Sequence, residues 1–173
     1  TYGEGDLSSI DGVLFDGDVL LAYPAGRDAD SYTVPDWVTA IGDCAFSNSN
    51  GLKGVILPDG LVSIGDSAFM SSGIQEIAIP DSVTHIGESA FYYSWLTSAD
   101  IGAGVTEIPQ EAFSLCDYLE TVTGGENVTS IGDWAFYECR ALYTFPYMPE
   151  LRSIGASAFD NCRSLETFEI GPD

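Results

Sequence analysis

The stretch that decides the fold is residues 79–102, IPDSVTHIGESAFYYSWLTSADIG. It is one copy of a unit that recurs along the chain, and its most constant mark is the dipeptide Ala90-Phe91. The steps between successive copies are 23, 22, 22, 23 and 23 residues, and the dipeptides end at Phe46, Phe69, Phe91, Phe113, Phe136 and Phe159. A fixed period of this length is typical of a solenoid, whose units bury their apolar sides only by stacking on one another.

Each unit contains two extended segments and one turn. The first segment follows the pattern Leu-x-x-Val-x-Ile, as in Leu52, Val55 and Leu57. Its period-2 alternation and β-branched residues predict a short strand. A Val-Thr-x-Ile piece predicts a second extended segment. The apolar residues that follow, spaced at i, i+4 and i+5 from the Ile, favour one helical turn around Ala-Phe. Stacked units would place like residues above like at about 4.8 Å per layer.

The quoted unit resembles the BspA-like, or Treponema pallidum-type, leucine-rich repeats of bacterial surface and secreted proteins. The resemblance covers residues 32–173 as about six units of 22–23 residues, and we expect the array to be truncated at its C-terminus. It implies a right-handed coil or horseshoe, with short parallel strands on the concave face and short helical or 3-10 turns opposite. The family's cysteine three residues after the Phe is matched by Cys116, Cys139 and Cys162, and serines stand there in the earlier units.

Residues 1–31 resemble the β-hairpin that caps such arrays. The pair Asp16-Gly17, between runs rich in Val and Leu, indicates a hairpin on its own account. We therefore expect an N-terminal hairpin cap at residues 1–31, followed by the repeat array at residues 32–173.

The composition excludes several classes of function. The chain has 173 residues, with 27 acidic side chains, 5 basic ones and a formal net charge of −22. Nucleic-acid binding needs Lys and Arg to neutralise phosphates, so we exclude it, and an anionic membrane surface is disfavoured for the same reason. The sequence contains no run of 18 apolar residues, so no transmembrane helix is predicted. The apolar share of 45% indicates a folded chain and not a charged disordered tail.

No pattern of catalytic residues is present, so we expect no enzyme, cofactor or metal site. The single histidine, His85, belongs to a column of exposed residues, and no Gly-x-Ser-x-Gly or Walker sequence occurs. The three cysteines in one column predict buried free thiols that cap loop carbonyls. The acidic column Asp43, Asp66, Glu88 and Asp133 favours capping of backbone N–H groups at the turn, with Ca²⁺ binding as the alternative.

Two surfaces are candidates for binding. Small, Thr-rich and acidic side chains should line the concave face: Glu76, Ser98, Asp100, Thr121, Thr123, Thr144, Thr167 and Glu169. An aromatic patch is expected near the loops: Tyr92, Tyr93, Trp95, Tyr118, Trp134, Tyr137 and Tyr143. Exposed aromatics beside acids suit a sugar ring or a protein hot spot. The alternative is that they shield the edge of the solenoid from water.

These observations favour a non-enzymatic interaction or adhesion module of a secreted or cell-surface bacterial protein. The resemblance implies attachment to host matrix proteins or to other bacteria, and thus an unidentified protein or a glycan as partner. One alternative is a structural spacer that presents another domain. A second is a carbohydrate-binding surface built on Trp95 and Tyr118. We expect a monomer or a weak end-to-end dimer, since an open solenoid end exposes strand edges.

Overall fold

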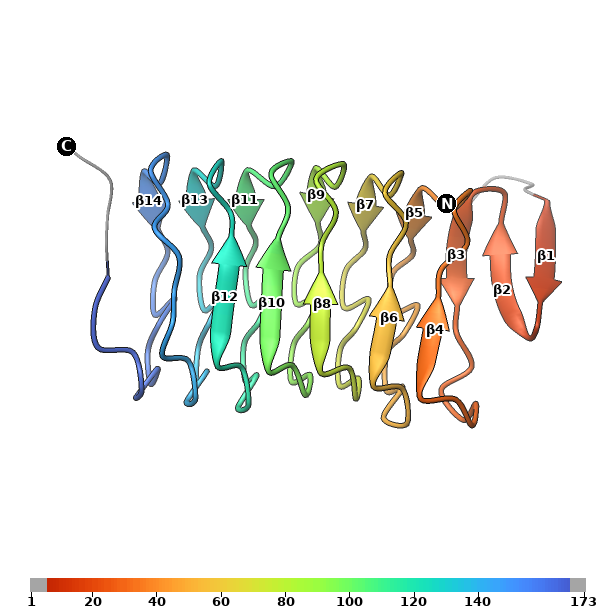
Figure 1. The fold of residues 1–173 in the computed structure, drawn as a ribbon, viewed down its shortest axis with the longest axis horizontal. Helices are drawn as coiled ribbons and strands as arrows, with labels where there is room; N and C mark the ends of the chain where they lie inside the picture. Colours follow the sequence, from red (N-terminus) through yellow and green to blue (C-terminus); the bar gives the residue numbers. More distant parts are fainter. Residues whose placement is uncertain (1–5, 169–173) are drawn as a thin grey trace.

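The computed structural model describes residues 6–168, and there the chain winds into a stack of coils with two columns of short strands (Figure 1). The first column follows the Leu-x-x-Val-x-Ile segments and the second follows the Val-Thr-x-Ile segments. The described strands are β1 (Leu7–Ile10), β2 (Val13–Asp16), β3 (Val19–Ala22), β4 (Ser31–Thr33), β5 (Ala40–Ile41), β6 (Gly54–Ile56), β7 (Ser63–Ile64), β8 (Glu76–Ala78), β9 (His85–Ile86), β10 (Ser98–Ile101), β11 (Glu107–Ile108), β12 (Thr121–Gly124), β13 (Ser130–Ile131) and β14 (Ser153–Ile154).

The parallel pairing follows the repeat. Strands β4, β6, β8, β10 and β12 form one five-stranded sheet, which we call the front sheet. In its register Glu76 pairs with Ser98, and Ser98 pairs with Thr121, so equivalent residues of successive coils lie beside one another. The architecture is therefore a parallel β-solenoid, as the period predicted.

The N-terminal hairpin extends the second column of strands. Strands β1, β2 and β3 pair antiparallel, and β3 then pairs in parallel with β5. Tyr23, just after β3, stacks on Phe46 with 5.2 Å between ring centroids and donates its backbone N–H to Ala45. The hairpin expected at Asp16-Gly17 is present, and it covers the first coil of the array.

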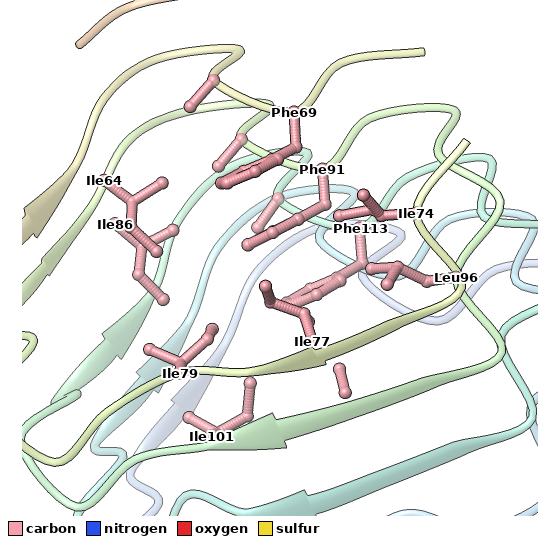
Figure 2. Close-up of a cluster of buried hydrophobic side chains, with 14 of the residues drawn as sticks. Ile64, Phe69, Ile74, Ile77, Ile79, Ile86, Phe91, Leu96, Ile101 and Phe113 are labelled. Carbon is pink, nitrogen blue, oxygen red and sulfur yellow. The ribbon is translucent and has the colours of Figure 1, made fainter. Parts of the chain in front are cut away.

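The core is a single column of buried side chains that runs along the solenoid (Figure 2). Its centre is the Phe ladder, whose neighbouring rings are 4.9–5.3 Å apart at interplanar angles of 3–8° from Phe46 to Phe159. Isoleucines such as Ile64, Ile77 and Ile86 pack around it, and Phe69, Phe91 and Phe113 are fully buried. Burying a side chain of this size contributes about 1.5–3 kcal/mol, and the ladder supplies one such ring in each coil.

The Ala-Phe turns differ from the sequence expectation, because residues 6–168 contain no α- or 3-10 helix. In every unit the residue before the Ala and the residue two after the Phe have left-handed backbones, for example Ser89 at φ 55° and Tyr93 at φ 54°. A right-handed helix cannot include such residues. Alternate backbone N–H groups of the turn instead donate to carbonyl oxygens of the next coil. The N–H of Phe91, for example, donates to the carbonyl oxygen of Ala112 at 2.8 Å.

Pro109 divides the second column of strands into two sheets. In the other coils the residue after the Ile of the Val-Thr-x-Ile segment is a glycine, and its N–H donates to a carbonyl oxygen of the preceding coil. Gly87 donates in this way to Ile64, and Gly132 donates to Ile108. Proline has no N–H to donate, so this ladder bond is lost between β9 and β11. The result is one sheet that ends at β9 and a separate three-stranded sheet of β11, β13 and β14.

The repeated glycine reflects close contact between coils. A Cβ added at Gly87 would lie 2.4 Å from the backbone nitrogen of Asp66 and 2.5 Å from its Oδ1. Any other residue would therefore push successive coils apart. At Gly42, where the preceding segment is the hairpin, the nearest atom would be 3.1 Å away, so the constraint is weaker beside the cap.

Candidate functional site

The outer face of the front sheet is lined by small and acidic residues. Glu76, Asp100 and Thr123 are exposed, and Ser98 and Thr121 are half-buried. Together they line a shallow groove of about 560 Å³ that runs across the strands from Ser31 to Thr123. Thr123 Oγ1 donates to Asp100 Oδ1 at 2.6 Å, which fixes one carboxylate within the groove.

The remaining residues predicted for this face lie toward its C-terminal end. Thr144 is exposed and continues the sheet by an isolated parallel bridge to Thr121. Thr167 is exposed but belongs to a segment that forms no strand, and Glu169 lies outside the described residues. The groove also contains Ile56, which was not among the residues predicted for this face, and its side chain is 63% exposed.

The predicted aromatic residues gather in two hollows and not in one patch. The first, which we call the turn hollow, is lined by Tyr92, Glu111, Ser114, Leu115, Trp134, Tyr137, Ser157 and Asp160. The second, the loop hollow, is lined by Tyr93, Ser94, Trp95, Leu115, Asp117 and Tyr118. Leu115 belongs to both, so the hollows are adjacent on the edge formed by the Ala-Phe turns. Tyr143 is exposed but lines neither hollow.

The two exposed aromatic rings of the loop hollow do not form a flat surface. In the loop hollow the centroids of Trp95 and Tyr118 are 6.5 Å apart, and the planes of the rings are tilted by 57°. The two residues are neighbours on adjacent coils. Both are more than half exposed, at 51% and 60%.

Carboxylates surround the turn hollow. Glu111 and Asp160 line it directly, and the charge of Glu138, with a hydrogen bond to the same carboxylate, raises the pKa of the Tyr137 phenol. Glu138 also binds Arg140, which in turn donates to Asp117 at 2.9 Å. Sequence reasoning did not place Glu111, Leu115 or Asp160 in a site, because their grouping depends on the left-handed turn geometry.

The cysteine column is structural. The Sγ atoms of Cys116, Cys139 and Cys162 donate to the carbonyl oxygens of Phe91, Phe113 and Phe136 at 3.1, 3.1 and 3.0 Å. Burial raises the pKa of the Cys116 thiol to about 11 and that of Cys139 well above its ordinary value. The prediction of free thiols that cap carbonyls is confirmed. Cys44 is also free, and it is exposed.

The acidic column accepts backbone N–H groups, but from the next coil. Asp43 Oδ1 accepts the Asp66 N–H at 3.0 Å, and Asp66 Oδ1 accepts the Glu88 N–H at 2.9 Å. Asp133 makes the equivalent bond to Ala156 at 2.6 Å. The expected capping role is thus present in a different form, since each aspartate ties two coils together.

His85 and the remaining acids form no recognisable catalytic group. His85 is exposed on β9 and lines a hollow with Asp66, Glu88 and Glu107, and no serine or cysteine lines it. Within residues 6–168, no three His, Cys, Asp or Glu side chains are grouped so that they could hold a metal ion. The described residues also include no helix long and apolar enough to cross a membrane.

Comparison with solved structures supports the fold. A leucine-rich repeat protein from Eubacterium ventriosum is 28% identical and superposes with a TM-score of 0.86, covering 95% of this chain and 45% of that one. The T. pallidum leucine-rich repeat protein is 21% identical, with a TM-score of 0.71 over 94% of this chain and 88% of that one. The pneumococcal vaccine antigen PcpA is 18% identical, with a TM-score of 0.61 over 90% and 49%. The last two show likeness of fold alone.

The chain therefore spans less than half the length of the E. ventriosum protein. No curated protein matches it. The family model for the BspA type leucine rich repeat region matches in six copies, over residues 25–143 and 84–173. With this match over most of its length, a repeat-by-repeat β-solenoid and the cysteine column, the chain belongs to the BspA-type leucine-rich repeat family.

Proposed function

We propose that this chain is a non-enzymatic protein-interaction module of a secreted or surface-attached bacterial protein. The observation that carries the proposal is the outer face of the front sheet, an open surface across β4, β6, β8, β10 and β12. Solenoids use extended surfaces of this kind to bind partners. Most of its outward-facing side chains are short, such as Ser98, Thr121 and Thr123, so a partner can approach the strands closely over several coils.

Family membership supports the location and the class of function. The BspA-type repeats resemble those of bacterial surface and secreted proteins, and the proposal extends that association to attachment to a host matrix protein or to a bacterial surface protein. The carbohydrate alternative has less support, because the Trp95 and Tyr118 rings are tilted by 57° and share no plane on which a sugar ring could stack. The spacer alternative makes no use of either exposed surface.

Capture from extracts tests the proposal. The immobilised chain is incubated with extracellular-matrix extract and with bacterial surface extract, and the retained proteins are identified by mass spectrometry. We expect one specific protein to be retained. The variant Ala78→Arg places a long charged side chain at the centre of the front-sheet groove, and Thr84→Arg places the same side chain at an exposed position next to β9.

Retention by the Thr84→Arg variant with loss in the Ala78→Arg variant supports binding through the front sheet. Equal loss in both variants would point to a general charge effect. If no protein is retained from either extract, the interaction proposal is wrong and the spacer alternative is favoured.

A further inference from the structure

We propose that the turn hollow binds an Arg or Lys side chain from an extended, basic segment of a protein partner, and that apolar neighbours of that side chain rest in the loop hollow. The inference deepens the proposed function and rests on it. It assigns a class of partner to a surface distinct from the front-sheet groove. Four observations lead to it.

The first observation is the combination of aromatic rings and carboxylates in one concave site. Tyr92, Trp134 and Tyr137 contribute aromatic side chains, and Glu111 and Asp160 contribute negative charge, to the lining of a hollow of about 450 Å³. A guanidinium or ammonium group is attracted both to an aromatic face and to a carboxylate. No Lys, Arg or His is among the residues that line this hollow, so no basic group of its own lining occupies it.

The second observation is that the nearby arginine is already engaged. Arg140 contacts Asp117 at 2.9 Å and Glu138 at 2.6 Å, so its charge is directed to those two carboxylates. Glu111 has only long contacts of 3.3 Å, from the Ser89 hydroxyl and from the side-chain amide of Gln110. The Glu111 carboxylate therefore retains capacity to accept strong hydrogen bonds from a cation.

The third observation concerns the backbone. Trp134, Tyr93 and Leu115 have φ angles of 54°, 54° and 59°, in the left-handed region that bulky residues disfavour. The equivalent positions of other coils hold smaller or more tolerant residues, such as Ser67, Ser157 and Asn161. Three bulky residues at unfavourable positions all line the two hollows. The left-handed backbone recurs in every coil, but the aromatic and branched apolar side chains on it gather at this surface, which motivates a functional and not a stabilising role for them.

The fourth observation is overall charge. The chain has a formal net charge of −22, so a basic partner is attracted over long range and an acidic one is repelled. Charge alone gives weak, salt-sensitive contact anywhere on the surface. The aromatic hollows make one location specific, because Trp and Tyr are the residues that most often dominate binding energy at interfaces.

The test uses the 173-residue chain and a pair of fluorescent peptides. One peptide alternates Arg with Gly and Leu, and its counterpart carries citrulline, a neutral isostere, in place of every Arg. Binding is measured by fluorescence anisotropy at low and at physiological salt. We expect the wild-type chain to bind the Arg peptide about tenfold more tightly than the citrulline peptide.

Two variants with matched controls locate the binding. Trp134→Ser introduces the residue found at the equivalent position of other coils without changing charge, and Glu111→Gln removes one charge from the hollow. We expect each to weaken binding of the Arg peptide about fivefold to tenfold. The controls are Tyr143→Ser, an exposed aromatic outside both hollows, and Glu107→Gln, an exposed acid on β11; each should change binding less than about twofold.

Thermal unfolding of Trp134→Ser adds a readout that a structural role would not produce. We expect its melting temperature to be equal to or higher than that of the wild type, because Ser accepts the left-handed backbone more readily. A lowered melting temperature with unchanged peptide binding would mean that Trp134 shields the coil edge, and the inference would be wrong.

Other outcomes also decide the matter. If Trp134→Ser and Glu111→Gln bind the Arg peptide as the wild type does, the attraction is non-specific and the inference fails. Loss of a glycan-array signal in Trp134→Ser, with no preference for Arg over citrulline, assigns the hollow to a carbohydrate instead. If the wild type captures a protein from extracts and Trp134→Ser captures it equally, this inference fails while the proposed function stands.

Discussion

The first three coils and the last three follow the same repeat, and one column of inward-facing residues separates them cleanly by residue type. Ser49, Ser72 and Ser94 occupy it in the early coils, and Cys116, Cys139 and Cys162 occupy it in the late coils. Every one of these thiols donates to a Phe carbonyl at 3.0–3.1 Å. The hydroxyls of Ser49 and Ser72 are buried without a hydrogen-bond partner.

The difference shows what the thiol supplies. Oxygen lies closer to Cβ than sulfur does, so a serine at this column does not reach the carbonyl of the preceding coil. A buried hydroxyl without a partner costs free energy, whereas a thiol is a small hydrophobe with a weak donor. At the boundary, Ser94 is satisfied only because its hydroxyl lies 3.2 Å from Cys116 Sγ. The late coils are therefore better adapted to this backbone.

The largest expected effect comes from converting a late coil into an early one. Cys139→Ser removes the bond to the Phe113 carbonyl and leaves a buried hydroxyl whose one neighbour in the column is the weak partner Cys162 Sγ, as Ser94 has Cys116 Sγ. We expect the free energy of unfolding to fall by about 2 kcal/mol, measured by urea denaturation.

Cys44→Ser is the matched control, since Cys44 is exposed and its replacement should change stability by less than about 0.5 kcal/mol. Equal losses of stability for Cys44→Ser and Cys139→Ser would contradict the claim that the position of the cysteine in the buried column, and not the residue type, decides the size of the loss.

Alkaline pH should lower the stability contributed by the late coils, because their cysteine thiols can ionise. The serines of the early coils do not ionise, so this column adds no such effect there. The pKa of the folded Cys116 thiol is about 11, against 9.0 for an unperturbed thiol. Above pH 9 the unfolded chain releases this proton and the folded chain retains it. Stability therefore falls as pH rises from about 9 to 11, and below pH 9 this thiol has no effect on the pH dependence.

We expect a loss of about 1–3 kcal/mol from Cys116 over that window. The measurement is the urea midpoint at several pH values for the wild type and for Cys116→Ala, so that ionisation of tyrosines cancels in the difference. Parallel curves for the two proteins would show that the thiol ionises equally in the folded and unfolded states, contrary to this expectation.

Converting an early coil into a late one should have the opposite sign and a smaller size. Ser72→Cys places a thiol where it can donate to the Phe46 carbonyl, as Cys139 does to Phe113. We expect a gain of about 1 kcal/mol in the free energy of unfolding. Ser72→Ala separates the two causes, because it removes the buried hydroxyl without adding a donor. A gain in the alanine variant equal to that of Ser72→Cys would mean that the thiol–carbonyl bond contributes nothing.

The repeat made most of this fold predictable. The 22- and 23-residue steps between phenylalanines were enough to place the strands, the Phe ladder and the cysteine column. The prediction of a helical turn at Ala-Phe was wrong, because apolar residues spaced at i, i+4 and i+5 occur both in a helix and in a turn with two left-handed residues. Asn48 and Asn161 at those positions are compatible with positive φ, but Ser, Glu and Trp in the other units give no sign of it.

The candidate site was less predictable because the backbone of the Ala-Phe turn was not foreseen. Sequence columns identified the aromatics one by one, but which of them face one hollow depends on how the turn projects its side chains. Trp134 and Tyr92 are 42 positions apart and line the same hollow, whereas Tyr143 lies outside both. Pro109 shows a further limit, since its division of the second column of strands into two sheets is seen only in the strand pairing.

Chemical labelling gives the smallest effect and the finest test of the comparison, because it leaves stability unchanged. Thiolates react with disulfide reagents, so a thiol whose pKa is raised and whose sulfur is buried reacts slowly. At pH 8 we expect Cys44 to react first, the half-buried Cys162 much later, and Cys116 and Cys139 only on the timescale of unfolding. Mass spectrometry of the labelled chain reports each site separately. Labelling of Cys139 as fast as Cys44 would mean that the late coils open locally, and that the thiol–carbonyl bonds do not hold them closed.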